Sequence, residues 1–408
     1  MANRNYLLYF IGNTISLHGL WVYRVALGWL AWELTRSEFW VGVVAFTQFA
    51  PAVLFGPIFG VLADRFDPAG GVAADQHDEH AVTWRSWHSP TACGKTDIYV
   101  LALLAMMQGI LDGAHMPVRM ALVPNLVTRA QLQSALATNS ISFNLSRFIG
   151  PAIAGLLIAS LGVAAAFAFN ALSYVAILAA LVVVRLRPTS RGSAPRGDVW
   201  HELKAGVRYV WRHADIRPLL AIIAAASVLG RGPLELLPAY ADAIFGRGSG
   251  GLAILTSAVG GGAIVAGLIL ARGAAWLRLE VVAGGIICGG LLIAALGISD
   301  LFWLSVCIVV ALGCTLSLCG VGSQILLQSL VDDDVRGRVS SLWGMVAFGG
   351  VALGGLLIGS LSSLFGLREV TVVTGLVCTV QIVVIMLRYR RTRPHAGSAA
   401  HTDAQQED

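Results

Sequence analysis

Gly60-Val61-Leu62-Ala63-Asp64-Arg65-Phe66-Asp67 is a short charged turn at the end of a long apolar run that begins at Phe39. The run is long enough to lie in the hydrocarbon of a bilayer, which a helix crosses with about 20 residues. A glycine lets two helices approach closely, and an adjacent Asp and Arg can hold a neighbouring helix end at the water boundary. The stretch therefore predicts a membrane helix that ends either in a latch or in an ordinary charged stop.

The composition extends this interpretation to the whole chain. Of the 408 residues, 56% are hydrophobic and 12% are charged, whereas charged residues make up about 25% of a typical soluble domain. Long apolar runs recur from end to end, and they predict an all-α, polytopic membrane protein with eleven clear spans. The predicted spans are 6–32, 39–63, 98–122, 134–160, 164–186, 218–243, 250–271, 280–299, 301–325, 340–365 and 369–387. The first run is too long for a signal-peptide core and has no small-residue cleavage site behind it, so we interpret it as a retained span.

The placement of the basic residues argues against a nucleic-acid partner, although the formal net charge is +5. The arginines collect in alternate loops, above all in the connection 187–217 and after the last span. Such an excess marks cytoplasmic loops, and it predicts an inner (cytoplasmic) membrane protein of bacterial type with both termini in the cytoplasm. Five of the six cysteines lie in apolar runs, where a small hydrophobic residue is the ordinary interpretation. We therefore expect no metal site and no disulfide framework.

The two halves of the chain repeat. Leu126, Gly150 and Gly162 have counterparts at Leu330, Gly354 and Gly366, a constant spacing of 204 residues. Parallel repeats of this kind are typical of secondary transporters. We expect an N-terminal bundle at 1–187, a cytoplasmic central loop at 188–217, a C-terminal bundle at 218–393 and a disordered tail at 394–408.

Residues 68–96 break the repeat. The span 280–299 should have a partner near 73–92, but four full charges lie between Gly71 and Gly94, and each costs roughly 2.5–3.5 kcal/mol near a helix centre. The chain must nevertheless cross the membrane there for its loops to alternate correctly. Three explanations remain: a reading-frame slip that is later restored, a marginal helix held by its neighbours, or a functional loop with metal-like chemistry. The residues for the last are His77, Asp78, His80, His88 and Cys93, without a regular ligand spacing.

Ionisable side chains inside spans are expensive and therefore mark functional sites. The alternative for each is a structural ion pair or a side chain that reaches the membrane surface. Asp112 and Glu235 are the two candidates for proton coupling, because a desolvated carboxyl group can bind a proton near neutral pH. Arg231 stands one turn before Glu235 and either neutralises it or leaves it to titrate. The candidates for a substrate cavity are Trp21, Arg24, Arg119, Asn139, Asn144, Arg147 and Arg231.

The opening charged turn resembles the signature loop between the second and third helices of the major facilitator superfamily. The closer resemblance is to the enterobactin-exporter-like (transmembrane secretion effector) branch, and it covers nearly the whole chain except 68–96. Six stretches carry it: Gly19–Leu30, Glu33–Ser37, Pro117–Pro124, Asn139–Arg147, Glu235–Asp242 and Arg336–Val339. In addition, Arg147–Gly155 looks like the Gly-Pro motif of the fifth helix in antiporters, with Gly155 alone where a glycine pair usually stands.

The resemblance implies two pseudo-symmetric six-helix bundles that rock about a central cavity. It also implies gating roles for Gly60, Asp64, Arg65, Gly150 and Pro151, with the Asp and Arg as a cytoplasmic latch. We expect a proton-coupled exporter of a small amphipathic compound, such as a siderophore or a drug. The protein is expected to act as a monomer in the lipid bilayer, with the proton gradient as its energy source and no cofactor. The alternative is a non-transporting or defective paralogue, or a sensor, on the same scaffold. An enzyme is not expected, because no nucleophile, base and oxyanion set converges.

Overall fold

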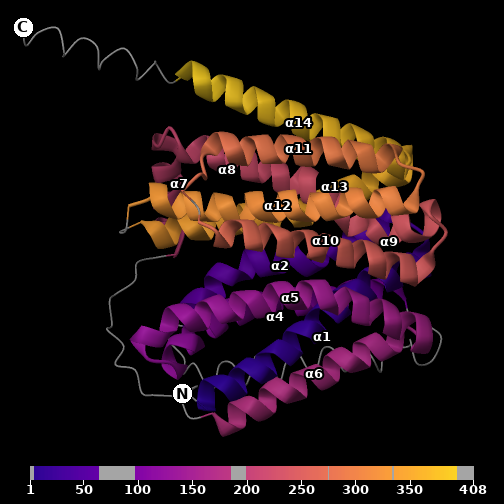
Figure 1. Cartoon of the computed structure of the whole chain (residues 1–408), viewed down its shortest axis with the longest axis horizontal. Coiled ribbons are helices and arrows are strands. Elements are labelled where there is room, and N and C mark those ends of the chain that lie inside the picture. Colours follow the sequence, from indigo (N-terminus) through magenta and orange to yellow (C-terminus); the bar gives the residue numbers. More distant parts are fainter. Residues whose placement is uncertain (1–3, 64–96, 185–198, 274, 333–334, 393–408) are drawn as a thin grey trace, which may run out of the picture.

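The structure is a computed structural model of the whole chain. It describes residues 4–63, 97–184, 199–273, 275–332 and 335–392, with some side chains inside these ranges left undescribed. The described residues form long helices that run roughly parallel to one another (Figure 1). We call the end of the bundle that holds the start of α1 and the connection to α8 the linker side, and the other end the far side.

The N-terminal half contains five described helices, and the C-terminal half contains a composite first span followed by five continuous helices. In the first half these are α1 (Arg4–Thr35), α2 (Glu38–Ala63), α4 (Ile98–Leu126), α5 (Arg129–Leu161) and α6 (Val163–Val183). The short α7 (Val199–Arg212) follows in the linker. The composite span is α8 (Ile216–Ala225), η1 (Ala226–Arg231), η2 (Gly232–Leu236), α9 (Leu237–Ala239) and η3 (Tyr240–Ile244). The remaining helices are α10 (Gly248–Ala271), α11 (Leu279–Ile298), α12 (Phe302–Leu330), α13 (Arg336–Phe365) and α14 (Leu367–Thr392).

All eleven predicted spans coincide with helices, and most of the helices extend beyond the predicted bounds. Among the described residues, nine helices are long and apolar enough to cross a membrane. Helix α1 is not one of them, and α4 contributes only the shorter apolar stretch Ile98–Gly113. In α1 polar side chains such as His18 and Arg24 lower the mean hydropathy, whereas in α4 the side chains that follow Gly113 lie outside the described part. The linker, expected to be a loop, contains the helix α7, whereas residues 68–96 lie outside the described part.

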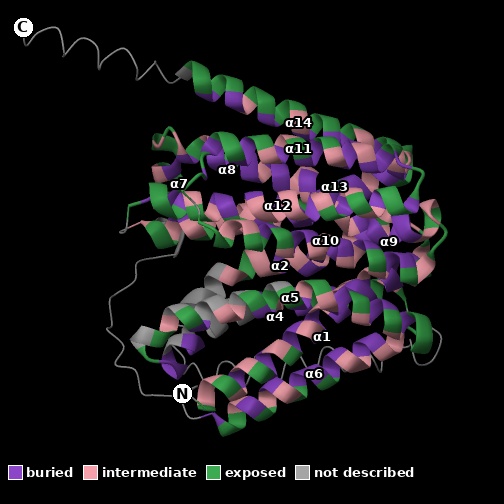
Figure 2. Cartoon of the chain, viewed as in Figure 1, coloured by how far each residue is buried: buried purple, intermediate pink, exposed green. Residues whose placement is uncertain are grey.

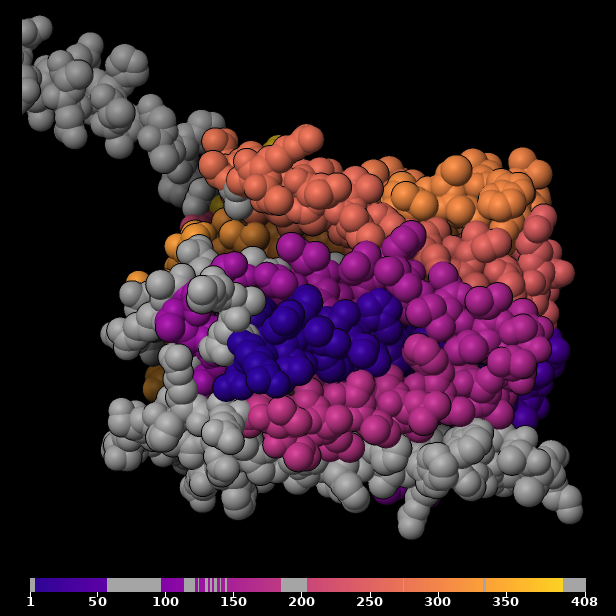
Figure 3. Space-filling view, turned by 60° about the horizontal axis from the view of Figure 1, so that its bottom comes forward, coloured from indigo at the N-terminus to yellow at the C-terminus, as the bar shows by residue number. Residues whose placement is uncertain are grey.

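The two halves form separate layers that meet along two pairs of helices (Figure 1). Helix α2 packs against α13, and α5 packs against α10. Within the first half, α1 lies between α5 and α6, and the turned view shows it at the surface there (Figure 3). Within the second half, α10 packs on α12, and α11 packs on both α12 and α14. The architecture is the expected major facilitator fold of two bundles.

Glycines allow the two halves to approach closely. A Cβ atom built on Gly260 of α10 would lie 2.6 Å from the Cα of Phe148 on α5. On the other pair of helices, a Cβ on Gly359 of α13 would lie 2.5 Å from the carbonyl oxygen of Glu38. Neither position has room for a side chain, so backbone meets backbone, as small residues permit between membrane helices.

The outward faces of the bundle are apolar, which suits contact with lipid. Figure 2 shows exposed residues along outer helices such as α6 and α14, and buried residues where helices face one another. Large hydrophobic side chains on these faces are strongly exposed, for example Leu156, Val182 and Leu364. On a soluble protein such a surface would be an aggregation site, but in a bilayer it faces the lipid chains.

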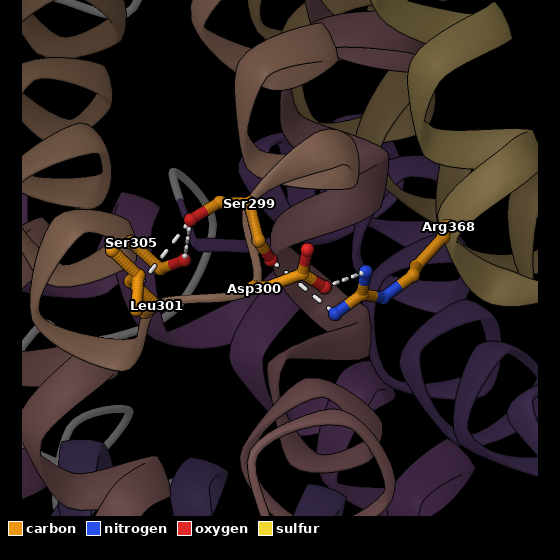
Figure 4. Close-up of polar contacts among 5 residues, drawn as sticks. All are labelled: Ser299, Asp300, Leu301, Ser305 and Arg368. Atoms are coloured by element: carbon orange, nitrogen blue, oxygen red, sulfur yellow. Dashed lines mark hydrogen bonds and ion pairs between the residues drawn. The ribbon is translucent and has the colours of Figure 1, made fainter.

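The loop between α11 and α12 lies on the far side of the second half, and Figure 4 shows its polar contacts. Arg368, at the start of α14, donates to the carboxylate of Asp300 and, at 3.4 Å, to the carbonyl oxygen of Ser299. The hydroxyl of Ser305 donates to that of Ser299 at 2.9 Å. These contacts lie entirely within the C-terminal half, and they fix the ends of three helices relative to one another.

Candidate functional site

Arg24 of α1 and Asp112 of α4 form an ion pair inside the first half. The Nη2 atom of Arg24 lies 3.3 Å from Oδ2 of Asp112. Gln108, one turn earlier on α4, donates its amide to Oδ1 of Asp112, also at 3.3 Å. The side chains of Arg24 and Asp112 are partly buried, with relative exposures of 22% and 13%. The structure thus brings a predicted cavity residue against a predicted proton-coupling residue.

Aromatic rings surround the guanidinium of Arg24. Its Cζ lies 5.1 Å from the ring centroid of Trp21 and 5.2 Å from that of Phe49 on α2. The guanidinium of Arg147, from α5, lies over the same Trp21 ring at 5.5 Å. Cation–π contacts of this kind are favourable at less than about 6 Å. Trp21 therefore contacts two arginines from two helices, and its Nε1 has no hydrogen-bond partner among the side chains that the structure describes.

The second half contributes Arg231 and Glu235. The composite span is irregular here, because a π-helical turn ends at Arg231 and a 3₁₀ turn runs from Gly232 to Leu236. Such interruptions are frequent at functional sites. A Cβ built on Gly355 of α13 would lie 3.7 Å from Cγ of Glu235 and 3.3 Å from Ala45 on α2. Glu235 is therefore placed where α13 meets α2, at the boundary between the halves.

Electrostatic interactions join the charges of the two halves. Glu235 of the second half lies close enough to Arg24 and Arg147 of the first half, and to Arg231, for their charges to interact. Arg231 and Glu235 are both described, and no ion pair within 4.0 Å joins them. We call Arg24, Asp112, Arg147, Arg231 and Glu235 the charge cluster.

The Gly-Pro segment of α5 sits beside this cluster. A Cβ built on Gly150 would lie 2.5 Å from the Cβ of Trp21, so glycine allows α5 to approach α1 at the level of the indole. Pro151 lies inside the helix, where it removes a backbone hydrogen bond. Gly155 meets Ala253 of α10, one turn further toward the far side. The segment therefore contacts both the cluster and the other half.

The structure does not bring every predicted residue to the cluster. Asn139 accepts a hydrogen bond from the Tyr6 hydroxyl at 3.5 Å, about 12 Å along α5 from Arg147 at 1.5 Å per residue. Gly60 lies in α2, and Arg119 and Asn144 lie in α4 and α5, but their surroundings are outside the described part. The predicted latch residues Asp64 and Arg65 also lie outside it.

A polar contact across the far side was not predicted. Asp242 of η3 pairs with Arg36, which follows α1, and accepts a hydrogen bond from Nε1 of Trp32 at 2.9 Å. Arg36 adopts a left-handed backbone with φ 50°, which turns the chain at the end of α1. We call this contact between the two halves the far-side latch. In the sequence, Arg36 and Asp242 each stand as a charged residue at the end of a predicted span. Both belong to stretches that carry the family resemblance, and nothing in the sequence indicated that they pair.

The remaining polar features do not add a second site. A hollow of ≈ 460 Å³ opens on the far side beside Arg247, Phe302 and Trp303, and none of the predicted site residues lines it. Within the described ranges, no three His, Cys, Asp or Glu side chains come together in a way that could hold a metal ion.

Comparison with known sequences relates nearly the whole chain to membrane transporters. A family model described as transmembrane secretion effector matches residues 1–406. The staphyloferrin A transporter of Staphylococcus aureus is 24% identical over 375 residues, which cover 90% of this chain and 92% of that protein. The enterobactin exporter EntS of Escherichia coli O1:K1 is also 24% identical, over 94% of this chain and 93% of that protein.

Comparison with solved structures supports the fold. The nucleoside transporter NupG superposes with a TM-score of 0.74 at 14% identity, over 94% of this chain and 98% of that one. A bacterial homologue of the human lysosomal transporter Spinster, in an inward-facing and occupied conformation, superposes with a TM-score of 0.74 at 15% identity. The match covers 96% of this chain and 98% of that one.

Proposed function

We propose that this chain, which belongs to the transmembrane secretion effector family of the major facilitator superfamily, exports a small amphipathic compound in exchange for protons. The comparisons show a multi-pass membrane transporter of the major facilitator type, and not an enzyme. Siderophores and drugs are the substrate classes we favour, since two relatives are named for siderophores. The observation that carries the proposal is the charge cluster, which joins both halves at membrane depth.

The orientation follows from the basic side chains. Exposed Lys204, Arg208 and Arg212 lie on the linker side, as do the basic residues that end α14. Because cytoplasmic loops carry such an excess, we place the linker side and both termini in the cytoplasm. The membrane is then the inner membrane of a bacterium, and the far side opens outward. We further propose that a single chain forms the transport unit.

The mechanism is alternating access by movement of the two halves. The far-side latch holds the outer ends of α1 and the composite span together, and the glycine contacts of α13 with α2 continue this closure toward the middle. We propose that Asp64 and Arg65 play the corresponding role on the cytoplasmic side. Gly150 and Pro151 would let α5 bend beside the cluster as the closure moves from one side to the other.

The charge cluster supplies the proton site. Glu235 interacts with arginines of both halves, and Asp112 pairs with Arg24. Protonation of either carboxyl group removes its attraction to these guanidiniums and so changes the electrostatic contact between the halves. For exchange, loss of the proton favours the substrate-bound state, and return of the proton expels the substrate.

A non-transporting paralogue or sensor is the second candidate. The specific observation in its favour is the charged sequence between Gly71 and Gly94, where the repeat requires an apolar third helix. A bundle that lacks a proper third helix would keep the fold of the other spans and lose the rocking movement. The sequence of the gene across codons 66–97 would show whether a shifted reading frame restores an apolar segment.

Efflux from proteoliposomes separates the two candidates. The purified chain is reconstituted, an inward pH gradient is imposed, and movement of a catecholate siderophore, a carboxylate siderophore and an amphipathic fluorescent dye is followed. An exporter moves at least one of these against its concentration gradient, and a protonophore stops the movement. A chain that moves none of the three, while it remains folded by thermal unfolding, supports the non-transporting alternative.

A further inference from the structure

The linker helix α7 has one face that packs against the bundle. A Cβ built on Gly206 would lie 3.1 Å from Cδ1 of Leu342 on α13, and Val210 is buried. The hydroxyl of Tyr209 donates to Oδ2 of Asp332 at 3.0 Å. These contacts hold a 14-residue helix, far too short to cross a membrane, in a fixed position on the linker side.

The other face of α7 is exposed and combines basic with apolar side chains. Lys204, Arg208 and Arg212 are exposed on it, together with Val207. Trp211 is 63% exposed. An indole that extends into water is unfavourable, whereas the boundary between headgroups and acyl chains is where tryptophan is enriched. A strongly amphipathic helix with basic residues and tryptophan on the free face is typical of helices that lie on a membrane surface.

Further cations continue this face. The guanidinium of Arg217, at the start of α8, lies 4.6 Å from the ring centroid of Trp211. The hydroxyl of Tyr389 donates to Oδ1 of Asp215 at 2.6 Å, which ties the end of α14 to the connection after α7. Arg390 and Arg391 next to it are exposed. We call the six cations the linker patch: Lys204, Arg208, Arg212, Arg217, Arg390 and Arg391.

Two carboxylates with described side chains lie beside the linker patch. Asp332 accepts a hydrogen bond from Tyr209, and Asp215 accepts one from Tyr389; a hydroxyl donor leaves each of them negative. The six cations outnumber these two carboxylates, so this described part of the patch is positive on balance, and its complement is a surface of negative charges. Six cations beside an exposed tryptophan match a plane of phosphates above hydrocarbon, because clusters of 4–8 basic residues on such helices bind anionic lipids.

We propose that the linker patch binds the headgroups of anionic phospholipids. The proposal does not depend on which substrate the protein carries or on proton coupling. Helix α7 packs against α13 of one half and also lies against α2 of the other. Lipid that holds α7 at the membrane surface would therefore act on both halves at the linker side.

Hydrogen exchange of the full-length protein in nanodiscs tests the proposal. Exchange of the backbone amides in 204–217 is compared in phosphatidylcholine alone and in phosphatidylcholine mixed with phosphatidylglycerol. A third sample has phosphatidylcholine with added inorganic phosphate. We expect slower exchange only with phosphatidylglycerol. Because each basic side chain strengthens attachment to an anionic surface by roughly five-fold, Arg208→Gln with Arg212→Gln should remove most of the slowing.

Two matched controls make the result specific. Arg272→Gln with Arg278→Gln removes the same charge from exposed positions on the same side, and it should leave the slowing intact. Trp211→Ser should reduce the slowing, whereas Trp303→Ser, at a 62% exposed tryptophan on the far side, should not. Equal exchange in both lipids, equal loss in both double variants, or protection by inorganic phosphate alone would overturn the proposal.

Discussion

Asp242→Asn should open the far side. The substitution removes the charge that pairs with Arg36 and weakens the hydrogen bond from Trp32, so it affects both parts of the far-side latch. The ion pair is partly exposed, since the Arg36 and Asp242 side chains keep 59% and 24% of their exposure, and pairs of this kind contribute about 0.5 kcal/mol. The bond from Trp32 adds about 1 kcal/mol. Asparagine keeps an oxygen that can accept from Trp32, so the loss lies between about 0.5 and 1.5 kcal/mol, which shifts the ratio of closed to open far side by roughly two- to ten-fold.

Spin-label distances measure this shift directly. Labels at Leu34→Cys and Ala243→Cys, both exposed on the far side of opposite halves, report the separation of the two ends once the native cysteines are replaced by alanine. Asp242→Asn should move a large share of the distance distribution to longer values. Arg36→Gln should move a smaller share, because the hydrogen bond from Trp32 to Asp242 remains. The ratio of closed to open far side should change by only about two-fold.

Asp300→Asn is the matched control. It breaks a second far-side ion pair, with Arg368, but that pair lies within the C-terminal half. The distance distribution should stay unchanged. If Asp242→Asn left the distribution unchanged, or if Asp300→Asn shifted it equally, the contact between Asp242 and the end of α1 would not be a latch between the halves.

Two further substitutions test the packing. Gly155→Ala places a methyl group against Cβ of Ala253 and should lower the free energy of unfolding by about 1–3 kcal/mol. Gly267→Ala, with nothing within 4 Å of the new methyl, should raise it by up to about 1 kcal/mol. Thermal unfolding in detergent distinguishes the two variants, and equal effects would contradict the close contact between α5 and α10. Tyr209→Phe deletes the hydrogen bond to Asp332. It should lower the free energy of unfolding by about 1 kcal/mol and therefore the melting temperature slightly. An unchanged melting temperature would mean that α7 is held by packing alone.

The sequence allowed the spans to be predicted, because hydrocarbon imposes a simple rule on which residues face it. Apolar runs of sufficient length had to be helices, and all eleven were. The same rule marked Arg24, Asp112, Arg147, Arg231 and Glu235, since each is costly at membrane depth. Their assembly into one cluster from α1, α4, α5 and the composite span depends on helix packing, which periodicity does not fix.

Other features were beyond the sequence for physical reasons. The far-side latch joins Arg36 to Asp242, which are far apart in the chain, and a charge at a span end usually faces water without a partner. Helix α7 was hidden within a linker rich in proline, glycine and arginine, where the breaker signals of 188–197 masked the amphipathic stretch after them. Asn139 was grouped with Arg147 because the two share α5, but eight residues of helical rise place it with Tyr6 instead.

Uphill transport by carboxylate variants tests the central claim most directly. Glu235→Gln and Asp112→Asn are reconstituted separately, with Glu280→Gln, an exposed carboxylate at the start of α11, as the control. We predict that at least one of the two cluster variants still lets a transported compound move down its gradient but no longer concentrates it in response to a pH gradient, while the control does both. If both cluster variants still drove proton-dependent accumulation, the charge cluster would not carry the coupling.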